Sequence, residues 1–199
     1  MSREPLPLFP LRTVLFPGAP LSLRIFEQRY LDMVRDCARS GSGFGVVCAW
    51  PAEQEGRAKH ARIGTEAMMV DFDQLDDGLL GVTCRGQRRF LIRDTRARDD
   101  GLLIAEIDWL PPEPAVPVPP RCAALQTLMQ ELMRHRDLAD HFEVDIEDAS
   151  SLGRTLAASL AFPEEHAQAL LEMTDPVARL EGLISLLHDA DADADDGED

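Results

Sequence analysis

The sequence predicts an α+β protein in which a strand-rich N-terminal part, residues 1–110, precedes a helical C-terminal part, residues 121–188. In the first part, short apolar runs that often alternate are separated by Gly, Pro and Asp turn signals, which is typical of an antiparallel barrel or a strongly coiled sheet. Residues 111–120, PPEPAVPVPP, hold six prolines in ten positions, and such a run favours a stiff extended linker. Beyond it, apolar residues recur at intervals of three and four, the helical period.

The first expected elements are edge strands followed by one helix. Prolines interrupt the apolar residues of segment 5–20, and proline is tolerated in sheets mainly at edges and turns. Alternation over residues 21–25 then predicts a strand. From Glu27 onward the apolar spacing becomes helical, and Gly41 can end that helix.

Further strands are expected between this helix and the proline-rich segment. Two Asp-Asp-Gly triplets, at 76–78 and 99–101, are turn signals. They separate apolar runs that favour extended structure. The expected strands are 44–50, 61–72, 79–84, 87–93 and 102–110.

Four helices are expected after the linker. The first contains an apolar stripe at i, i+3, i+4 and i+7 that starts at Leu125. The second can be capped by Ser150 or Ser151. Pro163 followed by two glutamates, and Asp175 followed by proline, are typical helix starts.

The charge of the chain is strongly negative. Residues 189–199 hold seven acids and no apolar side chain larger than alanine, so we expect a disordered acidic tail. The whole chain has 20 basic and 36 acidic side chains, a net charge of −16. Because such a chain repels phosphate backbones and anionic lipids, neither nucleic acid nor membrane is an expected partner. No apolar run approaches the roughly 18 residues that cross a bilayer, and the start lacks a signal-peptide pattern, so we expect a cytoplasmic protein.

Motifs for catalysis, metals and cofactors are missing from the sequence. The single lysine, Lys59, is followed by histidine, so no phosphate loop ending in GK[ST] is present. The histidines form no HExxH motif and the four cysteines form no CxxC pair, so we expect no metal and four buried, reduced thiols. No GxSxG motif is present either, although sequence separation alone leaves a serine triad open. We therefore expect neither a catalytic residue nor a cofactor.

The most distinctive stretch is PLPLFPLRTVLFPGAPLSLRIFEQRYLDMV, residues 5–34. Its pieces PLFPL, VLFPG and LRIFE with Arg29-Tyr30, followed by FGVV at 44–47 and Gly86 before Arg89-Phe90, occur in the order found in a known family. Asp175-Pro176 with Arg179-Leu180 continues that order. The chain resembles the amino-terminal substrate-recognition domain of the ATP-dependent Lon protease over about residues 5–188.

This resemblance implies a fold and a class of activity. The implied fold is a small β-barrel-like sheet related to pseudouridine-synthase-associated (PUA-like) domains, followed by a helical bundle. In the full-length protease this region is similar to a docking module for unfolded or damaged polypeptides. The sequence shows no ATPase segment and no Ser-Lys peptidase segment, so the resemblance implies a stand-alone, S16-peptidase-like binding domain that is not an enzyme.

The function expected from the resemblance is a non-catalytic module that binds unfolded or extended polypeptide, with a protease or chaperone as a further partner. The alternative is a small-molecule-binding or hydrolytic domain with a pocket between sheet and helices. Candidate polypeptide contacts are Phe9, Phe16, Arg24, Glu27 and Arg89. For the aromatic residues, Phe26 and Tyr30 included, core packing is the competing interpretation, and for the arginines it is ion pairing with nearby carboxylates. We expect Phe26 and Tyr30 to be core residues.

Overall fold

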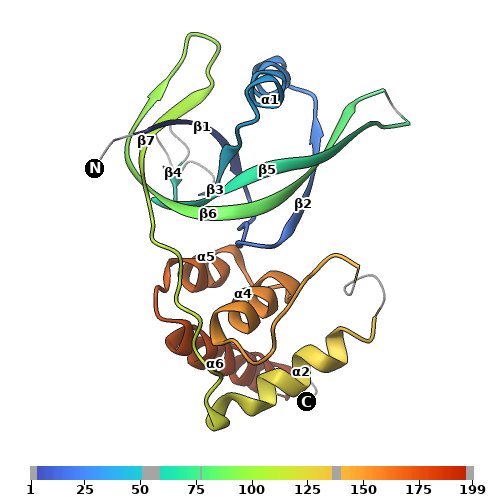
Figure 1. The fold of residues 1–199 in the computed structure, drawn as a ribbon, viewed down its shortest axis with the longest axis vertical. Helices are drawn as coiled ribbons and strands as arrows, with labels where there is room; N and C mark the ends of the chain where they lie inside the picture. Colours follow the sequence, from blue (N-terminus) through green and yellow to red (C-terminus); the bar gives the residue numbers. More distant parts are fainter. Residues whose placement is uncertain (1–3, 51–58, 77, 136–139, 196–199) are drawn as a thin grey trace. The chain divides into compact units, whose positions relative to one another are not determined.

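The computed structural model describes residues 4–50, 59–76, 78–135 and 140–195. The chain divides into two compact units, Met1–Pro112 and Glu113–Asp199 (Figure 1). The division falls inside the proline-rich segment. The first unit holds the strands and one helix, the second holds the remaining helices, so the α+β class expected from the sequence is confirmed.

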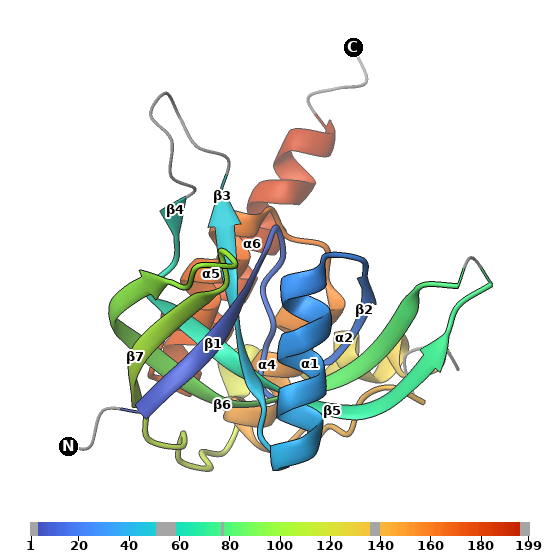
Figure 2. The same cartoon turned by 90° about the horizontal axis from the view of Figure 1, so that it is seen from above.

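The N-terminal unit is a seven-stranded sheet with the order β1-β7-β6-β5-β3-β4. β1 also pairs with β3, so β1, β7, β6, β5 and β3 form a closed ring, and β2 pairs with β6 outside it. Figures 1 and 2 show this ring with α1 lying between β1 and β2. The elements are β1 (Glu4–Leu11), β2 (Pro20–Ile25), α1 (Gln28–Ser40), β3 (Phe44–Trp50), β4 (Lys59–His60), β5 (Ile63–Gln74), β6 (Leu80–Ala97) and β7 (Leu103–Trp109).

The ring is closed by a parallel strand pair. β1 runs parallel to β3, from Leu8 opposite Gly45 to Leu11 opposite Cys48, whereas the other strand pairs are antiparallel. The sequence predicts an antiparallel barrel, so this one pair is the difference. A parallel pair needs a long crossover connection, and here β2 and α1 lie within that crossover. Hairpin turn signals alone do not indicate such a crossover.

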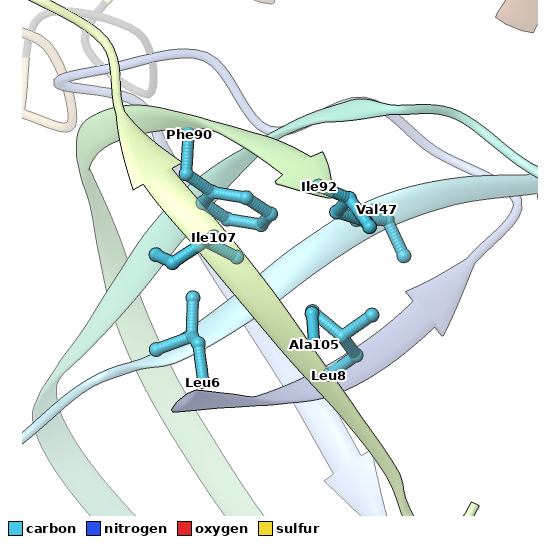
Figure 3. Packing of buried hydrophobic residues seen from close by; sticks show 7 residues of the cluster. All are labelled: Leu6, Leu8, Val47, Phe90, Ile92, Ala105 and Ile107. Carbon is cyan, nitrogen blue, oxygen red and sulfur yellow. The ribbon is translucent and has the colours of Figure 1, made fainter. Parts of the chain in front are cut away.

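The core of the ring is built from alternate residues of its strands. Phe90 is fully buried in this core and meets Trp109 edge-on, with ring centroids 6.2 Å apart. Alternate side chains of a strand point to one face, and this face is apolar on every strand of the cluster. The cluster in Figure 3 consists of Leu6, Leu8, Val47, Phe90, Ile92, Ala105 and Ile107.

Helix α1 lies where the apolar spacing predicts it. It follows Glu27 and ends at Gly41, whose φ of 66° is the left-handed conformation of a helix C-cap. Its buried face carries Met33, Val34 and Cys37. All four cysteines are buried and none forms a disulfide, and burial raises the pKa of Cys84 to about 12. The thiols therefore act as small apolar groups, as expected.

The connection between β1 and β2 rests directly on β6 at Gly86. The amide of Gly18 donates to Gly86 O and the amide of Gly86 donates to Ala19 O, each over 2.9 Å. A Cβ at position 86 would lie 2.2 Å from the carbonyl oxygen of Phe16. Only glycine allows two backbones to approach this closely. This contact fixes the point at which β2 starts.

Four α-helices and one 3-10 turn make up the described part of the C-terminal unit: η1 (Pro120–Cys122), α2 (Ala123–Leu132), α4 (Ala149–Ser159), α5 (Glu164–Glu172) and α6 (Pro176–Asp195). Helix α5 begins after Pro163, and Asp175 caps α6 by accepting from the amide of Val177, as the sequence predicts. The cap of α4 is Asp148 rather than Ser150 or Ser151. Its carboxylate also accepts from the amide of Val116, a contact across 32 positions that local sequence does not indicate.

Helix α6 runs further than the sequence suggests. It continues to Asp195, through most of the stretch expected to be a disordered tail, and residues 196–199 lie outside the described part of the chain, as does Asp77 of the first Asp-Asp-Gly turn. Alanine alternates with the acids in 189–195, and alanine is the strongest helix former. Backbone propensity therefore extends the helix where apolar anchoring is missing.

A buried ion pair joins the proline-rich segment to the helices. Arg179 of α6 is 1% exposed, and its Nη1 and Nη2 donate to the two oxygens of Glu113 over 2.8 and 2.6 Å. Arg179 also donates to the carbonyls of Leu170 and Met173. Ser150 and Arg154 supply further donors to Glu113. Each charged group is thus well supplied with hydrogen-bond partners, which is what a buried ion pair needs to offset its loss of hydration.

We expect Glu113→Gln to destabilise the protein by about 3 to 5 kcal/mol, because it leaves the charge of Arg179 buried without its counter-ion. Urea denaturation followed by circular dichroism measures this loss. Glu181→Gln, which removes an exposed pair with Arg121, is the control and should leave the midpoint unchanged. Equal midpoints for Glu113→Gln and the parent chain would contradict the assignment.

Gly86→Ala should destabilise by about 1 to 3 kcal/mol, because the new methyl group collides with the Phe16 carbonyl and the backbone must move apart. Thermal melting of the purified variant tests this expectation. Gly153→Ala is the comparison, since a Cβ there meets only side-chain atoms, the nearest at 3.3 Å. If both variants melted alike, the tight contact at Gly86 would carry no energetic weight.

Candidate functional site

The N-terminal unit has a cavity of about 980 Å³ beside the ring. Its walls come from the end of β1, from β2, from the start of α1, from the ends of β3 and β6, and from the start of β7. We call it the edge pocket, and its lining residues include Phe9–Arg12, Ser22–Glu27, Arg29, Tyr30, Ala49, Trp50, His60, Gly101 and Leu103.

Two strand edges lie open along the edge pocket. Residues 22–25 of β2 all line it, although successive side chains of a strand point to opposite faces, so the pocket follows the edge of β2 rather than one face. In the described residues β2 pairs only with β6. The ladder between β1 and β7 ends where Leu8 meets Leu103. The next residues of β1 also line the pocket, and no strand of the described ranges pairs with them on that side. These edges present backbone N–H and C=O groups that another extended chain can pair with.

A third strand edge, that of β5 beyond its pairing with β3, is obstructed. β3 pairs with β5 only over three residues, and the last pair is Phe44 opposite Ala67. Beyond it, the register of β5 against β6 shifts between Met69 and Asp71. The amide of Phe72 is occupied by the Asp71 carboxylate at 2.8 Å. A bulge and a charged side chain that covers an amide are common means of blocking an edge strand. This edge is therefore a poorer template than that of β2.

Aromatic side chains give the edge pocket its apolar surface. Phe9 and Tyr30 are stacked, with ring centroids 4.1 Å apart. Burial raises the pKa of Tyr30 above its usual value, against the opposing effect of Arg29, so its hydroxyl stays protonated near neutral pH. Phe26 is 69% exposed, which corrects the prediction that it is a core residue. Its neighbour Ile25 takes the buried side of the strand, and the period of two turns Phe26 outward.

Charged residues at the edge pocket are mainly basic. Arg29 contacts Glu27 over 2.7 Å and donates to the carbonyl of Gly101 over 3.0 Å. Its guanidinium carbon lies 4.7 Å from the ring centroid of Tyr30. Nε of Arg29 and Nε1 of Trp50 are buried and have no hydrogen-bond partner in the described part of the chain. Both atoms are donors, so a bound group could satisfy them only by offering an acceptor.

Three of the five residues expected to contact polypeptide meet at the edge pocket: Phe9, Arg24 and Glu27. The other two do not. Phe16 is 1% exposed because its loop rests on β6, and Arg89 is 5% exposed in the middle of β6, opposite Thr65 of β5. These two side chains are buried and do not line the edge pocket, so we do not propose them as polypeptide contacts there. Phe9 is also largely buried, at 8% exposed, but it does line the pocket.

Sequence reasoning missed Arg12, Arg29 and Trp50 as parts of this site. The signal that could have pointed to the arginines is the uneven distribution of charge along the chain. Residues 1–112 have 15 basic and 16 acidic side chains, whereas residues 113–199 have 5 and 20. The C-terminal unit therefore has a net charge of −15, and the unit that holds the edge pocket, at −1, is almost neutral.

The described residues offer neither a cluster of metal ligands nor a membrane-spanning helix. Across the described ranges, no group of three or more His, Cys, Asp or Glu side chains is placed to hold a metal ion. No described helix is both long enough and apolar enough to cross a bilayer. A second cavity of about 220 Å³ lies between the end of α1 and β5, with Met68 and Met69 in its wall.

The chain is similar to several known proteins. A Lon N-terminal domain protein from Xanthomonas campestris has a similar solved structure, with 38% identity, a TM-score of 0.79, and coverage of 92% of this chain and 98% of that one. Lon protease 2 of Myxococcus xanthus is 28% identical over 92% of this chain and 23% of its own length. Protein cereblon of Danio rerio is 30% identical over 55% of this chain and 26% of its own length.

The chain spans about a quarter of the length of these two curated relatives. Residues 5–189 match the family model described as the ATP-dependent protease La (Lon) substrate-binding domain. The match covers both units, and the ring of strands followed by helices is the fold that the sequence resemblance implies. The chain therefore belongs to the family of Lon substrate-binding domains.

Proposed function

We propose that this protein is a non-catalytic module that binds extended segments of unfolded polypeptide in the edge pocket. The observation that carries the proposal is the open edge of β2, of which residues 22–25 line the cavity without a second strand partner in the described residues. An extended segment that pairs with such an edge gains main-chain hydrogen bonds whatever its sequence. Folded proteins rarely offer a free extended segment, so this mode favours unfolded chains.

The walls of the edge pocket support the same proposal. Phe26 is largely exposed, and the stacked rings of Phe9 and Tyr30 line the same pocket. Aromatic side chains supply large contact areas with few rotatable bonds, and they dominate binding energies at many protein interfaces. The family is described as substrate-binding in an ATP-dependent protease, which is consistent with capture of polypeptide. A protease or chaperone partner would then act on the captured segment.

A small-molecule or hydrolytic function is the alternative. One observation favours it: the cavity volume of about 980 Å³ lies at the upper end of the range for small-molecule pockets. A metabolite screen by thermal shift separates the two proposals, because a ligand at 100 times its Kd adds about 2.7 kcal/mol of stability. Polypeptide capture predicts no metabolite shift of this size.

Phe26→Ala should weaken the binding of unfolded polypeptide at least about fivefold, as expected when an exposed aromatic anchor is lost. Stability should stay within about 0.5 kcal/mol, because the ring is exposed. Fluorescence anisotropy with labelled reduced, carboxamidomethylated lysozyme measures the affinity, and urea denaturation measures the stability.

The matched control is Phe72→Ala, since Phe72 is 68% exposed on β5 and does not line the edge pocket. This variant should bind as the parent chain does. Native lysozyme should bind neither protein. Equal losses for the two variants, or equal affinity for native and unfolded lysozyme, would count against the proposed function.

A further inference from the structure

We propose that the edge pocket selects extended segments in which an Asp or Glu side chain lies two positions from an aromatic or aliphatic one. Arg12, Arg24 and Arg29 are the residues that attract and bind that carboxylate. The inference rests on the proposed function, because it names the class of polypeptide that the same pocket takes. A general unfolded-chain receptor would need only the strand edges and the apolar wall, whereas this pocket has a charge preference in addition.

The first argument is the charge of the lining. Among the lining residues that the structure describes, three are arginines and one, Glu27, is a carboxylate. This excess of positive charge occurs in a chain with a net charge of −16. A cleft lined by one sign of charge focuses the field and raises the local concentration of the opposite charge. Segments rich in lysine and arginine are disfavoured by the same field.

The second argument is the preorganisation of Arg29. Its guanidinium is fixed to the pocket wall by Glu27 at 2.7 Å and by the carbonyl of Gly101 at 3.0 Å. A side chain that is already held in place loses little entropy when a ligand arrives. Its Nε is buried without a hydrogen-bond partner in the described residues, and a carboxylate brings strong acceptors to this neighbourhood.

The third argument is the adjacency of the cationic and apolar surfaces. Arg29 lies 4.7 Å from the centroid of Tyr30, which is stacked on Phe9. Side chains i and i+2 of an extended segment point to the same face, about 7 Å apart. One such pair can therefore place an apolar group against the stacked rings and a carboxylate near the arginines. The edge of β2 lines the same pocket, and Arg24 is on that strand.

The test uses the full chain and three capped, fluorescein-labelled nine-residue peptides. The peptides share two Phe residues and differ only at the positions two residues after each Phe, which are Glu, Gln or Lys. Fluorescence anisotropy should give an affinity for the Glu peptide about tenfold higher than for the Gln peptide, as a charge-assisted contact provides. The Lys peptide should bind most weakly.

Arginine variants locate this preference. Arg24→Gln should reduce the ratio of Glu to Gln affinity to about fivefold or less, since only Arg12 and Arg29 then remain to bind the carboxylate. The control is Arg35→Gln, which removes the same charge from an exposed position on α1 outside the pocket lining. It should keep the full ratio. If Arg24→Gln does not fold by circular dichroism, Arg12→Gln decides in its place.

The outcomes separate the two proposals. Equal binding of the Glu and Gln peptides would overturn the acid preference and leave the proposed function standing. No binding of any peptide, together with no binding of unfolded lysozyme, would overturn both. A ratio that falls equally in Arg24→Gln and Arg35→Gln would overturn the assignment to the pocket, and so would tighter binding of a nine-nucleotide single-stranded RNA than of the Glu peptide.

Discussion

The parallel pairing of β1 with β3 is the constraint on which the rest of the N-terminal unit depends. It closes the ring, and it requires the chain to leave the ring and return between these two strands. β2 and α1 lie in that excursion, so β2 pairs with β6 on one side only among the described residues. The open edge that lines the pocket is thus a geometric consequence of how the ring closes.

Two further contacts, one in each unit, hold a segment of the chain in place. The loop before β2 is fixed to β6 through Gly86, where a side chain has no room. In the other unit, the pair of Arg179 with Glu113 ties the first part of the proline-rich segment to α6. Each contact joins residues that are far apart in the sequence. Each therefore fixes the position of one segment against another of the same unit.

Local features of the fold could be predicted from the sequence, whereas long-range ones could not. Gly41 as a helix end and Asp175 as a helix cap depend on residues within one turn, and both were predicted. The pairing of Arg179 with Glu113 spans 66 positions and has no local signal. At the site, period-two alternation could have placed Phe26 outward once Ile25 was assigned inward. Burial of Phe16 depends on the close approach at Gly86, which no pattern of apolar residues encodes.

The Asp71 carboxylate on the amide of Phe72 has a consequence for self-association. A protein with two equivalent free edges can add copies of itself without limit and grow into a filament. With the β5 edge obstructed, only the β2 edge of these two can pair, and growth through them stops at a pair of molecules. The β2 edge can therefore stay accessible to a partner without the protein growing into a filament through β2 and β5.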